Sequence, residues 1–145
     1  MAAHASPSSV TGRRSEPLRT AGVVFAIALV IHGADHLRRG MDVLTPTVFW
    51  AGNVQIVLSI VTLVLIFVRH RLAPAFAAVL GFASAIGFTA AHVVPHWSSF
   101  SDSFTGPHHA PHVSGFSWFA AACEIGAGLY LGIAAVVTMR RGRPA

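Results

Sequence analysis

Long apolar stretches separated by short polar segments dominate the pattern of hydrophobic and polar positions along the chain. A helix that crosses the hydrocarbon core of a bilayer needs about 20 apolar residues at a rise of 1.5 Å per residue. Each of these stretches meets that length. The pattern therefore predicts four membrane-spanning helices, at residues 18–37, 48–68, 72–94 and 116–139.

The short connections between these stretches favour helices that run antiparallel to their neighbours. We therefore expect an all-α fold, an integral membrane four-helix bundle with up-down-up-down topology, in which residues 18–139 form one domain. Residues 1–17 are rich in Ser, Ala and Pro without apolar periodicity, which predicts a disordered cytoplasmic tail. Residues 140–145 are expected to form a second cytoplasmic tail.

The first stretch has a second interpretation, because its unbroken apolar part, residues 21–31, also has the length of a signal-peptide core. A cleaved signal would need small residues at the following cleavage site. The segment from His32 to His36 reads His-Gly-Ala-Asp-His instead. The sequence therefore favours a retained helix over a signal peptide.

Composition agrees with a membrane protein. The chain has 145 residues, of which 54% are hydrophobic and only 10% are charged, whereas a soluble domain usually carries about 25% charged residues. The formal net charge is +5, but the Arg residues stand in short clusters between apolar stretches. That placement is typical of membrane topology signals and argues for the lipid bilayer, and against nucleic acid, as the partner. The single Cys123 excludes an internal disulfide.

Arginine placement predicts the orientation, because cytoplasmic segments carry an excess of basic residues. Eight of the ten basic residues fall on one side of an up-down-up-down chain, and only Arg38 and Arg39 fall on the other. Both termini are therefore expected in the cytoplasm of a multi-pass plasma-membrane protein, with loops 38–47 and 95–115 outside. Aromatic residues favour the membrane interface, and all three Trp residues fall at the outer helix ends: Trp50, Trp97 and Trp118.

Small residues spaced by four predict where helices approach closely, because small side chains let helix backbones pack together in lipid. On the last span the stripe includes Glu124, and on the third span it is shorter. Three polar residues of the second span also share one stripe. These positions are Ala120, Glu124, Gly128 and Gly132; Gly81 and Ala85; and Gln55, Ser59 and Thr62.

Ionisable side chains inside the spans are the candidates for function. Each costs about 2.5–3.5 kcal/mol on insertion scales, so such groups usually face the bundle interior and serve a purpose. The i, i+3, i+4 spacing of His32, Asp35 and His36 puts them on one helix face, and His92 and His96 are expected one turn apart on another. With Glu124 on the last span, all are expected at one level in the outer half of the membrane.

Two pairs of His with two carboxylates predict a site for a transition metal or haem b. Imidazole binds Zn, Cu, Fe and Ni, and added carboxylates favour Zn or Fe over Cu(I). The outer loop adds three His within five residues, as in short metal-binding tracts. The candidate ligands are His32, Asp35, His36, His92, His96, Glu124, His108, His109 and His112.

Three of the charged residues near this site have more than one interpretation. Asp35 is either a ligand or an acceptor that orients a His ligand. Arg38 and Arg39 are either interfacial anchors or cofactor-binding residues that recognise an anionic lipid head group or a haem propionate.

The H-x-x-x-H pairs at His32 and His92, followed by H-H-x-x-H at His108, resemble the histidine boxes of membrane di-iron desaturases and hydroxylases. That resemblance implies a metal-dependent oxidation, although the boxes of those larger proteins face the cytoplasm. The paired His on two helices are also similar to the haem ligands of b-type cytochromes, which implies electron transfer.

Three functions follow from these residues. The favoured function is a small membrane protein that binds a metal or haem in a redox or metal-handling role. The alternatives are a non-catalytic subunit of a larger membrane complex, whose polar cluster is a hydrogen-bond network, and a proton or ion path. A path through such short helices would require a homo-oligomer. Motifs for nucleotide binding, Cys-based zinc sites and serine nucleophiles do not occur.

Overall fold

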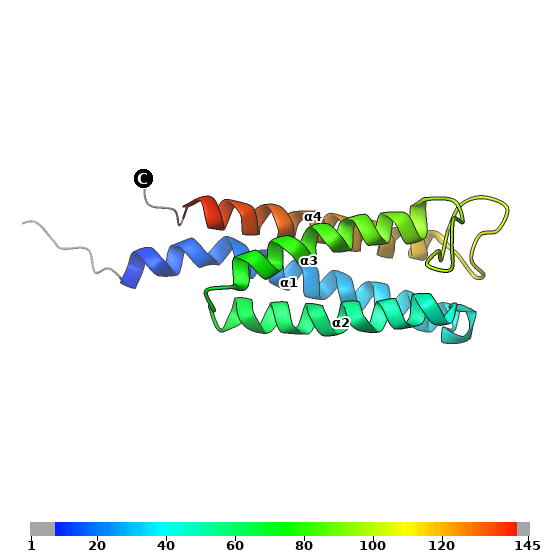
Figure 1. Ribbon diagram of the computed structural model, residues 1–145, viewed down its shortest axis with the longest axis horizontal. Coiled ribbons are helices and arrows are strands. Elements are labelled where there is room, and N and C mark those ends of the chain that lie inside the picture. The colour runs from blue at the N-terminus through cyan, green and yellow to red at the C-terminus, as the bar shows by residue number, and fades with distance from the viewer. Residues whose placement is uncertain (1–7, 142–145) are drawn as a thin grey trace, which may run out of the picture.

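The computed structural model describes the backbone of residues 8–141 and the side chains of residues 16–141, and within that part of the chain it is all-helical (Figure 1). Four of its helices are long and apolar enough to span a membrane, which confirms the predicted number. In order, the elements are α1 Ser8–Arg39, the short 3-10 helix η1 Met41–Val43, α2 Pro46–Phe67, α3 Ala73–Phe88, η2 Thr89–Val93 and α4 Gly115–Arg141. The element η2 continues α3 as one widened turn of π-helix.

Local sequence accounts for two of the helix ends. Thr45 caps α2, because its side-chain oxygen accepts a hydrogen bond from the Val48 amide at 3.2 Å, and Pro46 follows in the first turn. At the end of η2, Pro95 disfavours helical backbone in the preceding residue. Val94 is accordingly extended, with φ −71° and ψ 136°. The third span therefore ends at Val93.

The first helix is longer than predicted. It begins at Ser8, whereas the sequence placed a tail over residues 1–17. Pro17 lies inside α1 without ending it. Of the predicted tails, residues 1–7 and 142–145 lie outside the described residues, and the cytoplasmic location of both tails stays a prediction.

The helix α4 is the centre of the bundle and packs along both α1 and α3. Its predicted small-residue stripe is the reason for the close packing against α3. A Cβ atom added to Gly81 would lie only 2.5 Å from the backbone nitrogen of Gly132 and 2.6 Å from the carbonyl oxygen of Gly128. The helix α2 is more peripheral, and its buried side is the predicted polar stripe, including Ser59 and Thr62.

One end of the bundle carries both the α1–α2 connection and the segment 94–114 (Figure 1), and we call it the loop end. The segment folds back onto the helices there. The amides of Asp102 and Phe104 donate to the carbonyl oxygens of Ala91 and His92, at 3.0 and 2.8 Å. The side chain of Thr45 donates to the carbonyl oxygen of Ser99 at 2.7 Å. These contacts bring the segment against η2 and the start of α2.

Candidate metal centre

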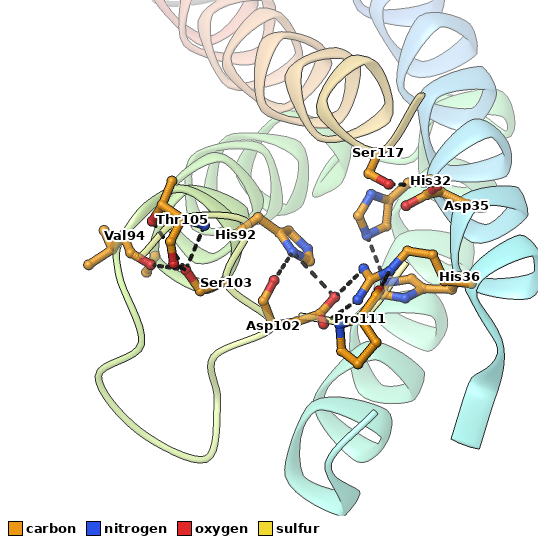
Figure 2. Close-up of polar contacts among 12 residues, drawn as sticks. His32, Asp35, His36, His92, Val94, Asp102, Ser103, Thr105, Pro111 and Ser117 are labelled. Atoms are coloured by element: carbon orange, nitrogen blue, oxygen red, sulfur yellow. Dashed lines mark hydrogen bonds and ion pairs between the residues drawn. The ribbon is translucent and has the colours of Figure 1, made fainter. Parts of the chain in front are cut away.

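Three histidines meet inside the bundle near the loop end. His32 and His36 lie one turn apart on α1, and His92 lies on η2 (Figure 2). One ring nitrogen of each can be chosen such that all three atoms lie within 4.8 Å of one another. The Nε2 atoms of His32 and His36 are 3.0 Å apart. The three residues therefore lie close enough to hold a metal ion, and we call them the His cluster.

The widened turn of η2 gives His92 its position. The backbone hydrogen bond from the Val94 amide to the Thr89 carbonyl oxygen, 3.1 Å long, spans five residues instead of four. The hydroxyl of Thr89 also donates to the Ala85 carbonyl oxygen at 2.7 Å. Such π-helical turns occur frequently at functional sites. Here the turn carries a buried His92 whose ring centroid lies 5.0 Å from that of His32.

Asp102 orients His92, and no pattern in the sequence marks Asp102 as part of the site. The Nδ1 atom of His92 lies 3.0 Å from the backbone carbonyl oxygen of Asp102 and 3.5 Å from its carboxylate. With only acceptors there, Nδ1 carries the proton and donates it. The other ring nitrogen, Nε2, is then unprotonated and free to bind a metal, which is the usual way in which an outer acceptor prepares a His ligand.

Arg39 in turn holds Asp102. The two guanidinium nitrogens Nη1 and Nη2 donate to the two carboxylate oxygens, each at 2.6 Å, and Nε donates to the Pro111 carbonyl oxygen at 3.1 Å. The Arg39 side chain is 0% exposed. This buried ion pair fastens the segment 94–114 over the His cluster (Figure 2).

Asp35 pairs with an arginine rather than with a histidine. Its Oδ1 atom accepts from the Arg38 guanidinium at 2.9 and 3.1 Å and from the Ser117 hydroxyl at 3.1 Å. Both arginines that the sequence suggested for cofactor binding thus bind carboxylates of this chain. Arg38 additionally donates to the His112 carbonyl oxygen at 3.0 Å.

Several predicted ligands lie outside the His cluster. His96 was expected one helical turn after His92, but the helix ends before it because of Pro95, and His96 is exposed. His108, His109 and His112 are exposed as well, on the segment 94–114. Among the described residues that could form a metal-binding group, only the three of the His cluster lie together.

Glu124 is also outside this group, on α4. It is fully buried, and neither of its carboxylate oxygens has a hydrogen-bond partner among the described residues. The ring atoms His32 Nδ1 and His36 Nδ1 are buried without a partner in the same way. The expected convergence of two His pairs and two carboxylates on one centre is therefore reduced to three imidazoles.

A cavity of about 770 Å³ opens beside the His cluster, between α1, α2 and α3. All three histidines form part of its wall. Near them the Gln55 amide donates to the Ser84 hydroxyl at 2.7 Å and joins α2 to α3. A metal bound by three imidazoles would keep a coordination position for a further ligand, as catalytic zinc sites do, and the three histidines that would hold it line the cavity.

No known family model, curated protein or solved structure matches this chain.

Proposed function

We propose that the chain is a membrane protein that binds one divalent transition metal, zinc or iron, through the Nε2 atoms of His32, His36 and His92. The observation that carries the proposal is the convergence of three ring nitrogens within 4.8 Å, from the buried His32 and His92 and the half-buried His36. Two nitrogen ligands at 2.0–2.1 Å from a tetrahedral metal stand about 3.3 Å apart. The His32 and His36 Nε2 atoms, 3.0 Å apart, need to separate only slightly to reach that distance.

The neighbouring charges support a metal over a purely structural network. Both carboxylates beside the His cluster are engaged by arginines, Asp35 by Arg38 and Asp102 by Arg39. They stabilise the surroundings of the cluster without pairing with His32 or His36. Three imidazoles facing one another can share only few protons, whereas a cation accepts all three lone pairs at once.

A haem held between His32 and His36 fits the geometry less well. The axial ligands of a bis-His haem lie on opposite faces of the porphyrin, so their nitrogens stand roughly 4 Å apart, twice a metal–nitrogen bond. The 3.0 Å between the two nitrogens on α1 is too short for a porphyrin to pass between them. The guanidinium groups of Arg38 and Arg39, suggested for the propionates, are bound to Asp35 and Asp102.

The position of the His cluster sets its proposed role. With both termini in the cytoplasm, the loop end faces outwards, so the metal lies below the outer surface of the plasma membrane. In that position the metal would be reached through the cavity beside the His cluster, and the segment 94–114 would cover it. We propose a redox or metal-handling function at this centre. An accessory subunit of a membrane complex is the alternative.

Elemental analysis and a visible spectrum of protein purified from membranes test the proposal. We expect about one zinc or iron per chain and no Soret band. His92→Ala should abolish stoichiometric metal binding, because it removes one of three ligands. His96→Ala is the matched control, since His96 is exposed and outside the cluster, and it should keep the metal.

Wild-type protein that takes up no stoichiometric zinc or iron, even after loading with either ion, would contradict the proposal and favour the accessory subunit. Equal metal content in the two variants would exclude His92 as a ligand. A Soret band that His92→Ala abolishes would replace the metal ion by haem.

A further inference from the structure

The cavity beside the His cluster is lined mainly by apolar side chains from three helices. Leu29 and Val30 of α1, Val48 and Ile56 of α2 and Phe88 of α3 contribute to its wall, and no Asp, Glu, Lys or Arg does. Its volume of about 770 Å³ lies within the range of small-molecule sites, about 300–1,000 Å³. The cavity is therefore large enough for an organic molecule, and it suits one that is mostly uncharged.

Glycines keep this space open. Gly33 on α1, Gly52 on α2 and Gly87 on α3 all line the cavity, and a Cβ atom added to any of them would meet no atom within 4 Å. This differs from Gly81 and Gly128, where a Cβ atom would collide with the facing helix. Helix packing explains those two glycines, but it does not require the three that line the cavity.

The position of the cavity within the membrane spans determines which molecules can enter it. These wall residues belong to segments that are long and apolar enough to cross a membrane, so acyl chains rather than water surround them in a bilayer. Gly33, Gly52 and Gly87 are all exposed. A molecule dissolved in the hydrocarbon phase can therefore reach the cavity sideways between the helices.

The His cluster contributes three of the polar side chains on the wall, and only these can bind a metal as imidazoles. A divalent metal held by neutral imidazoles would be an uncompensated positive charge in this apolar space. It would favour an anionic oxygen ligand, because an unpaired buried charge is costly. Asp35 and Asp102 cannot supply that ligand while they pair with Arg38 and Arg39. The buried carboxylate of Glu124 lies outside the group of side chains close enough together to hold the ion.

We propose that the cavity binds a single-chain lipid with a carboxylate head group, a long-chain fatty acid, with its chain against the apolar wall and its head at the His cluster. The choice of head group rests on the proposed metal, whereas binding of the chain rests on the cavity alone. The fatty acid would provide the further metal ligand that the chain itself does not.

Photo-crosslinking tests this proposal on the full-length protein in lipid nanodiscs. The probe is palmitic acid with a diazirine on its chain, and adducts are located by mass spectrometry. We expect adducts on cavity-lining peptides of α1, α2 and α3, and a several-fold loss of labelling in the presence of excess palmitic acid. Gly52→Leu should lower labelling several-fold, because the new side chain fills open space in the cavity.

Gly126→Leu is the matched control. Gly126 also has no atom within 4 Å of an added Cβ, but it lies on α4 beside a separate, smaller hollow, so labelling of the large cavity should be unchanged. Gly33→Leu fills the same cavity from α1 and serves as a second variant if Gly52→Leu fails to fold. Metal content is measured on every preparation.

Labelling that excess palmitic acid does not compete, or that spreads evenly over the lipid-facing helices, would show that bilayer lipid merely fills the space and would overturn the proposal. Equal labelling of the cavity-filling variants and Gly126→Leu would do the same. Saturable labelling in protein without stoichiometric metal would support the cavity site and contradict the metal centre alone. Stoichiometric metal without saturable labelling would contradict the cavity site alone.

Discussion

At the scale of single residues, Asp102 connects more of the site than any predicted ligand does. Its backbone carbonyl oxygen accepts from His92, and its carboxylate pairs with both terminal nitrogens of Arg39. Burying two charges is costly unless they pair with good geometry, and here the geometry is bidentate. The position of His92 therefore depends on a residue of the segment 94–114, ten positions along the chain.

Asp102→Asn should lower the free energy of unfolding by about 3–5 kcal/mol, because the buried Arg39 guanidinium loses its counter-charge. Chemical unfolding in detergent, followed by circular dichroism, measures the change. Asp42→Asn is the control, since Asp42 is an exposed acid at the same end of the bundle. Equal stabilities of the two variants would show that the ion pair contributes nothing. Replacing both partners, Arg39→Met with Asp102→Leu, should restore much of the loss.

The sequence predicted single ligands only where helical geometry fixes them. His32 and His36 share a face by their spacing, and no loop conformation enters that argument. His96 was wrongly placed on a helix, although Pro95 in front of it is a local signal for the helix end. Asp102 could not be predicted, because its contact with Arg39 depends on how the segment 94–114 folds back, and no periodicity encodes that.

At the scale of elements, the close contact between α3 and α4 shows why small residues recur on both helices. Gly81 faces the backbone of Gly128 and Gly132 directly. Spacing by four predicted these stripes, since a helix repeats its face in that way. The stripes did not predict that α2 would be peripheral, because its sequence is as apolar as that of the other spans.

Gly81→Ala should destabilise the bundle by about 1–3 kcal/mol, the usual range for overpacking, because the new methyl group meets backbone atoms that cannot move aside. Gly87→Ala makes the same change on the same helix where nothing lies within 4 Å, and it should leave stability unchanged. Unfolding curves of both variants in detergent measure this difference in the free energy of unfolding. Indistinguishable curves would mean that α3 and α4 are not packed this closely.

At the scale of the whole molecule, the number and type of helices followed from the sequence, because span length and apolar content are local properties. The side of the membrane that each end of the bundle faces is predicted from the distribution of Arg residues. The loop end carries Arg38 and Arg39 and the exposed His108, His109 and His112, and both arginines are bound to carboxylates. Only two of the ten basic residues, Arg38 and Arg39, lie near the helix ends on this side, so the count of basic residues favours the loop end as the outer end.

Cysteine labelling in intact cells tests this orientation. In a Cys123→Ser background, His109→Cys should react with a membrane-impermeant maleimide, because the segment 94–114 is expected outside. His70→Cys, in the exposed turn between α2 and α3, should react only after permeabilisation, since the excess of Arg is expected to retain that turn in the cytoplasm. The reverse pattern would place the His cluster near the cytoplasmic surface.

The central position of α4 has a consequence for how the protein is made. Two of the histidines arrive early in synthesis with α1, and the third arrives with η2. Asp102, which orients that third histidine, follows only afterwards, and the helix that packs along both α1 and α3 is synthesised last. Chains emerge from the N-terminus onwards, so a nascent chain holds all three imidazoles before it has the frame that aligns them. At the proposed metal centre, we therefore expect the ion to be loaded after translation, once α4 has been inserted.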